Sequence, residues 1–146
     1  MLTHVRISEQ ALDPAGEAAR LPSDAGAIVS FTGCVRADDG VSALSLEHYP
    51  GMTEREIAGH VAEAGRRWPL VGAVVVHRVG RLKPGEPIVL VAVAATHRRE
   101  AFAACEFLID YLKTKAPFWK QEHRGAGARW VEARASDAAA AQRWSK

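Results

Sequence analysis

The chain must change direction at Pro117, which separates a lysine-containing helical segment from an aromatic one. Proline has no N–H for a helix interior and biases the preceding residue, Ala116, away from helical angles. A helix before it therefore ends near Lys113, and Lys120 lies just past the break. Two ammonium groups on either side of a bend can converge on an anion. Alternatively, the charge of one lysine can make the amine of the other a nucleophile. Taken alone, a lysine in the last helical turn more commonly just complements the helix dipole.

Hydrophobic patterns predict strands and helices in an irregular order. Short apolar or alternating runs predict strands at 5–7, 27–31, 44–49, 73–79, 88–95, 118–122 and 130–133. Helical periodicity or composition predicts helices at 13–20, 53–68, 99–113 and 136–144. The run 88–95 is almost continuously apolar, so it predicts a central strand covered on both faces. Because the elements do not alternate regularly, an α+β fold is favoured over a doubly wound sheet.

Local signals mark several boundaries. Thr53 and Glu56 have the spacing of a capping box, with Met52 and Ile57 as its hydrophobic staple. Residues 83–86, Lys-Pro-Gly-Glu, have proline and glycine where a type II turn requires them. Polar residues 36–40 and glycine-rich residues 124–127 predict two further turns.

Length and composition narrow the class of protein. The 146 residues fit one domain, 1–146, and 48% hydrophobic with 25% charged residues is typical of a globular chain. A net charge of +2 is too small for a nucleic-acid protein driven by bulk charge. Cys34 and Cys105 do not have the spacing of metal ligands and do not suggest a disulfide framework, which fits a reducing compartment. The sequence shows no secretory signal and no apolar run of membrane-spanning length, so we expect a soluble cytoplasmic protein. Walker A, GxGxxG, GxSxG and HExxH motifs are absent.

Basic residues supply the other candidates for an anion site. His97 and Arg98 open the 99–113 helix, where exposed N–H groups attract anions and where cations are unfavourably placed unless they serve a purpose. Arg36 leaves a strand into a polar loop, a usual place for a ligand-binding arginine, although a lone arginine there is more often a surface residue; Arg134, beyond the last strand, is equally ambiguous. His77 lies within a strand without a metal-ligand partner, so a structural or interface role is favoured, and Cys34 is interpreted as a structural thiol.

In order, these segments resemble the large, catalytic subunit of molybdopterin synthase from about Val5 to Trp144. The segments that carry the resemblance are Phe31–Arg36, Leu46–Met52, His77–Gly80, Gly85–Glu86, His97–Phe102, Asp110–Glu122 and Trp130. No one motif is decisive, but their order and intervals are specific. The resemblance implies an α+β single domain with a hammerhead-like arrangement, a mixed, mostly antiparallel sheet and a C-terminal β-hairpin.

The resemblance also implies a reaction and its partners. Such subunits take sulfur from the C-terminal Gly-Gly thiocarboxylate of a small ubiquitin-like subunit and install it on cyclic pyranopterin monophosphate as the dithiolene of molybdopterin, in molybdenum cofactor biosynthesis. It implies no metal or organic cofactor, a cytoplasmic homodimer, and a heterotetramer with the small subunit. By position, Lys113 and Lys120 match the catalytic lysines, and Arg36, His97, Arg98 and Arg134 join them in binding the substrate.

This chain departs from the family pattern at Cys34, where relatives can carry a basic residue, and in a short 37–40 loop. Two rival functions remain: a phosphate- or RNA-binding module, and a scaffold that only docks a ubiquitin-like protein. The chain lacks the interleaved aromatic and basic residues of common RNA-binding modules. The scaffold predicts that Lys113 is dispensable.

Overall fold

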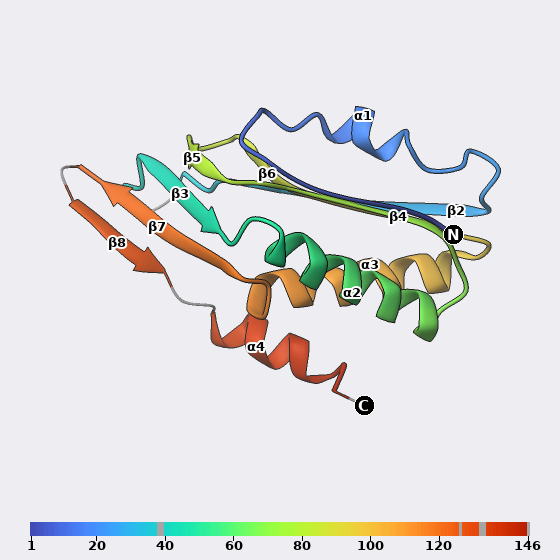
Figure 1. Cartoon of the computed structure of the whole chain (residues 1–146). Coiled ribbons are helices and arrows are strands. Elements are labelled where there is room, and N and C mark those ends of the chain that lie inside the picture. Colours follow the sequence, from blue (N-terminus) through green and yellow to red (C-terminus); the bar gives the residue numbers. More distant parts are fainter. Residues whose placement is uncertain (38–39, 126, 132–133, 146) are drawn as a thin grey trace.

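The computed structural model describes residues 1–37, 40–125, 127–131 and 134–145 (Figure 1). Its helices and strands, in chain order, are β1 (Leu2–Ser8), α1 (Pro14–Ala18), β2 (Ala27–Cys34), β3 (Ala43–His48), α2 (Met52–Arg67), β4 (Leu70–Arg78), β5 (Gly80–Leu82), β6 (Pro87–Ala95), α3 (Arg98–Thr114), β7 (Phe118–Arg124), β8 (Gly127–Val131) and α4 (Ala135–Gln142). The irregular order of strands and helices confirms the α+β prediction. None of the described helices is long and apolar enough to cross a membrane.

The first sheet has the strand order β1-β4-β6-β2 and carries most of the core. Helices α2 and α3 pack on one face against Val75, Val91 and Val93. The segment containing α1 covers the opposite face, over Leu90 and Ala92 (Figure 1). Alternate side chains of β6 thus enter two different cores, which confirms a central strand covered on both faces.

The second sheet has the order β5-β3-β7-β8 and ends in the β7–β8 hairpin. Of the described strand pairs, β1–β4 is parallel and the others are antiparallel, as a mixed, mostly antiparallel arrangement requires. The sequence did not predict the division into two sheets. A small apolar cluster of Val35, Leu46, Val79 and Leu82 joins them, so the second sheet is fixed beside one end of the first.

The predicted capping box at Thr53 is wrong. Helix α2 begins at Met52, and its N-cap is Gly51 with φ of +84°, while Glu54 accepts the Gly51 N–H at 3.1 Å. Thr53 is fully buried: its Oγ1 accepts the Tyr49 N–H at 3.1 Å and donates to the Pro117 carbonyl at 3.4 Å. The hydroxyl therefore joins α2 to the start of β7 instead of capping a helix.

The other predicted boundaries agree within a few residues. Gly85 has φ of +88° and the Glu86 N–H donates to the Lys83 carbonyl at 3.1 Å, which confirms the turn at 83–86. Of the other predicted loop and strand ends, Asp38, Asp39, Ala126 and residues 132–133 lie outside the described residues.

Candidate active site

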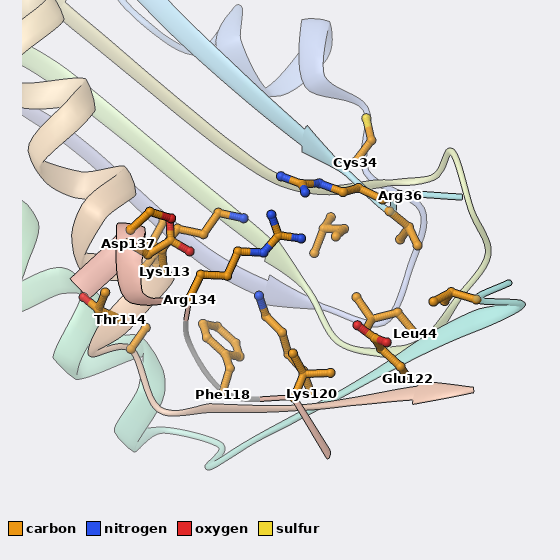
Figure 2. A pocket seen from close by; sticks show the side chains of 17 residues that line it. Cys34, Arg36, Leu44, Lys113, Thr114, Phe118, Lys120, Glu122, Arg134 and Asp137 are labelled. Atoms are coloured by element: carbon orange, nitrogen blue, oxygen red, sulfur yellow. The ribbon is translucent and has the colours of Figure 1, made fainter. Parts of the chain in front are cut away.

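A cavity of about 340 Å³ lies between the C-terminal end of α3, the second sheet and the start of α4 (Figure 2). Its polar lining contains four side-chain cations and two carboxylates. Apolar residues from β3, β6, β7 and β8 complete it. The lining residues are Cys34, Val35, Arg36, Val41, Leu44, Ile88, Leu112, Lys113, Thr114, Ala116, Phe118, Lys120, Glu122, Val131, Arg134, Ser136 and Asp137.

The break at Pro117 brings the two lysines into this cavity. Helix α3 ends at Thr114, and the N–H groups of Lys115 and Ala116 both donate to the Tyr111 carbonyl, at 2.8 and 3.2 Å. The chain then reverses into β7, where period-2 alternation gives Lys120 the same face as Phe118. Lys113 and Lys120 therefore line one space, as the bend allows (Figure 2).

Helix α4 contributes the other end of the lining. Its N-cap, Arg134, and its first-turn acid, Asp137, both face the cavity. The far end of α4 is fixed on α3, because the Trp144 indole N–H and the Arg143 guanidinium donate to Asp110 Oδ2 at 2.6 and 2.8 Å. The N-terminal end of α4 thus lines a cationic cavity, and backbone N–H groups at a helix N-terminus favour an anion.

The four cations Arg36, Lys113, Lys120 and Arg134 point toward a common space, as Figure 2 shows. Burial lowers the pKa of Lys120, and the charges of Lys113, Arg134 and Arg36 lower it further, against an opposing contribution from Asp137. A larger fraction of this amine is therefore neutral near physiological pH than for an ordinary lysine. A neutral amine can accept a proton or attack a carbonyl, which a surface ammonium cannot.

Glu122, the second carboxylate of the lining, already has cationic partners. Its Oε2 lies 2.7 Å from Arg124 Nη2 and 3.6 Å from Arg129 Nη2. The hairpin arginines thus offset the Glu122 charge. A net positive potential remains for a ligand.

His77 forms a buried support behind the cavity wall. Its Nδ1–H donates to the Arg78 carbonyl at 2.7 Å, and its ring stacks on Phe118 with centroids 4.0 Å apart. Burial, with the positive charges of Lys120 and Lys113, lowers the pKa of His77 to about 3. The imidazole is therefore neutral and adds no charge, consistent with the structural role expected for it.

His97 and Arg98 lie far from this cavity within one chain. His97 is the N-cap of α3 and Arg98 its first residue, as predicted. With a rise of about 1.5 Å per residue, α3 separates Arg98 from Lys113 by roughly 22 Å. One copy of the chain thus brings together four of the six predicted site residues.

Sequence reasoning missed Asp137 and Glu122. Alternation along β7 places Glu122 on the same face as Lys120, a signal that was available from the spacing. Asp137 had no such signal, because α4 reaches the cavity through long-range contacts with α3. Cys34, interpreted as a structural thiol, is instead exposed on the cavity lining. No cluster of three or more His, Cys, Asp or Glu within the described ranges is arranged to hold a metal ion.

Comparison with known proteins gives consistent matches along the chain. A family model described as MoaE protein matches residues 7–115. The molybdopterin synthase catalytic subunit of Pseudomonas aeruginosa is 53% identical over 148 residues, covering 97% of this chain and 99% of that relative.

Solved structures match equally broadly. The molybdopterin biosynthesis MoaE protein from Burkholderia ambifaria has a TM-score of 0.85 and 51% identity, covering 99% of each chain. Molybdopterin synthase from Staphylococcus aureus has a TM-score of 0.80 and 32% identity, covering 86% of this chain and 94% of that one.

Proposed function

The chain belongs to the MoaE family, and we propose that it works as a molybdopterin synthase catalytic subunit through the cavity that contains Lys113 and Lys120. In this reaction, sulfur passes from the C-terminal thiocarboxylate of a small ubiquitin-like subunit to cyclic pyranopterin monophosphate, which becomes molybdopterin. The observation that carries the proposal is the convergence of four cations on one cavity, in which the pKa of Lys120 is lowered.

The charges of the cavity match both reactants. The substrate carries a phosphate and the small subunit ends in an anionic thiocarboxylate, so each is attracted to fixed cations. When the cyclic phosphate opens to a terminal phosphate it gains negative charge, and preplaced guanidinium and ammonium groups stabilise that change. Arg36 and Arg134 bind the phosphate in this proposal, while Lys113 and Lys120 serve the sulfur transfer.

Lys120 is suited to move a proton, because part of its population is the neutral amine. Lys113 holds that amine in a cationic environment and attracts the thiocarboxylate. The Phe118 ring, supported by His77, forms an apolar wall beside Lys120. The extended Gly-Gly tail of the partner fits this arrangement, because glycine passes through a slot too narrow for side chains.

We further propose that the subunit forms a homodimer and that each end binds one small subunit, giving a heterotetramer. In this assembly His97 and Arg98 of one copy approach the cavity of the other, which would explain cations at the unfavourable end of α3. Trp119 and Trp130 are exposed and available to interfaces, whereas Trp144 packs on Trp68 and Phe107. The two unpaired cysteines fit the reducing cytoplasm proposed as its compartment.

Varying the length of the partner's tail tests the proposal. With purified small subunit bearing the thiocarboxylate, removing the two glycines should abolish molybdopterin formation, and adding one residue should nearly do so, because the sulfur misses the reacting carbon. Binding of the partner's globular body should survive both changes. A normal rate with the extended tail would contradict transfer inside this cavity.

The two rival functions make different predictions. A nucleic-acid binder would lose affinity steeply as salt is added, and would bind RNA in the absence of the small subunit. A docking scaffold would keep full function after removal of the Lys113 amine.

A further inference from the structure

The backbone at Arg36 is held in place by the 83–86 turn, whose residues do not line the cavity. The β2–β6 register shifts between Gly33 and Cys34, so the chain leaves the regular ladder just before Arg36. Val35 pairs instead with the 83–86 turn: its N–H donates to the Glu86 carbonyl at 2.9 Å, and its carbonyl accepts the Gly85 N–H at 2.8 Å. The Val35 side chain is buried in the cluster that joins the two sheets. The turn therefore fixes the backbone from which Arg36 projects.

The conformation of the 83–86 turn depends on the Glu86 carboxylate. Its Oε1 accepts the Lys83 N–H at 3.0 Å, which closes the turn, and its Oε2 is ion-paired with Arg78 Nη1. Arg78 is the last residue of β4 and is only 8% exposed. Its Nη2 donates to the Glu9 carbonyl at 3.0 Å, just beyond β1. The Arg78–Glu86 pair thus connects the turn to the edge half of the first sheet.

A half-buried ion pair is weak evidence for a role in stability, because desolvation offsets much of its attraction. The position of this ion pair beside the turn instead points to a role in orienting a binding residue. Groups that orient a binding residue are themselves commonly fixed by a second layer of hydrogen bonds. Arg78 and Glu86 form such a second layer for Arg36, because they fix the turn that hydrogen-bonds to Val35, the residue before Arg36.

We propose that Arg78 and Glu86 are positioning residues for Arg36, holding the 83–86 turn so that the Arg36 guanidinium reaches the anion in the cavity. The proposal deepens the function given above and rests on it for the identity of the anion. It predicts that Arg78 and Glu86 affect substrate binding only through Arg36.

A double-mutant cycle tests this dependence, with the affinity of cyclic pyranopterin monophosphate measured by calorimetry. We expect Glu86→Gln, which keeps the shape and removes the charge, to weaken binding on the order of tenfold. In an Arg36→Ala background the same change should have no further effect, because the misplaced group is already absent. An equal further loss in that background would overturn the proposal. Arg78→Lys is the second variant, and the same non-additivity is expected.

Glu17→Gln is the matched control for lost stability. Glu17 is more deeply buried than Glu86 and is likewise paired with arginine, with Arg6 Nη2 at 2.7 Å and Arg20 Nε at 2.9 Å, but it lies on α1, away from the cavity. It should lower the thermal midpoint and leave the affinity unchanged; an equal loss of affinity would overturn the positioning role. Unchanged affinity in Arg36→Ala itself would instead contradict the proposed function of the cavity, and this inference with it.

Discussion

Lys120 shows most clearly what the cavity does to a single side chain. It shares the lining with three other cations, and both its burial and their charges disfavour its protonated form. Protonated Lys120 is therefore less stable in the folded state than in an unfolded chain, where the lysine stays protonated up to its ordinary pKa. At neutral pH Lys120 therefore lowers the free energy of unfolding. This destabilising effect disappears as the pH rises toward the ordinary lysine pKa. Retaining such a group suggests that its neutral amine is used.

Two neighbours of Lys120 act on its pKa in opposite directions, so two variants should move it oppositely. Removing a cation with Arg134→Gln should raise the Lys120 pKa, and removing a carboxylate with Asp137→Asn should lower it. NMR titration of ¹³C-labelled lysine side chains measures both shifts, and the rising limb of the pH–rate profile should follow them. Shifts of the same sign in the two variants would contradict the electrostatic account of the cavity.

His77 makes a second residue-scale prediction, on acid stability. Its pKa is about 3 in the fold, chiefly because of burial, against about 6.5 in an unfolded chain. Between these values the unfolded chain binds a proton that the native state does not, so stability falls as pH falls, by roughly 1 kcal/mol per pH unit. In His77→Gln, urea unfolding across that window should show a shallower dependence than the wild type. Equal slopes would mean that His77 is already protonated in the fold.

At the scale of elements, the helix break and the central strand could be predicted because their causes are local. Pro117 prevents α3 from continuing, independently of tertiary contacts. The residues of β6 are consecutive and apolar, so this strand is visible in the local sequence. The start of α2 was misplaced because Thr53 is engaged by the distant Pro117 carbonyl. Similarly, Lys120 pairs across the sheet with Leu46, a contact between distant segments that no local pattern encodes.

Two glycines offer a paired test of element packing. A Cβ at Gly26, just before β2, would lie 1.9 Å from the Thr96 carbonyl oxygen, so Gly26→Ala must displace backbone and should cost about 1–3 kcal/mol or more. Gly59 lies inside α2 with open space around its Cβ position, so Gly59→Ala should stabilise the isolated subunit by about 0.5–1 kcal/mol. Denaturant unfolding measures both changes, and a neutral Gly26→Ala would contradict the close approach of β2 and the 95–97 segment.

At the scale of the whole molecule, the proposed homodimer accounts for the position of α3. The helix carries Lys113 at one end and Arg98 at the other, so these two residues cannot share one anion within a chain. The sequence predicts both as site residues but cannot assign them to copies of the chain, because that assignment depends on how two surfaces meet. Symmetric dimers resolve such a separation by bringing different ends of equivalent elements together.

Mixing inactive dimers tests this arrangement. If Lys113→Ala and Arg98→Ala each abolish activity, exchange of subunits between them should restore about a quarter of the wild-type sites, because each mixed dimer contains one intact site. Light scattering checks that both variants remain dimers. If activity does not recover after verified exchange, Lys113 and Arg98 do not act across the dimer, and a 15.8 kDa monomer would rule out the dimer itself.

Molybdopterin formation by Lys113→Ala, measured beside Lys115→Ala, tests whether sulfur transfer occurs in the cavity lined by Lys113. Both lysines lie at the end of α3, but Lys115 is exposed and does not line the cavity. With thiocarboxylated small subunit and cyclic pyranopterin monophosphate, folded Lys113→Ala should form no product, whereas Lys115→Ala should work at close to the wild-type rate. A near-normal rate for folded Lys113→Ala, or equal losses in the two variants, would contradict sulfur transfer in this cavity.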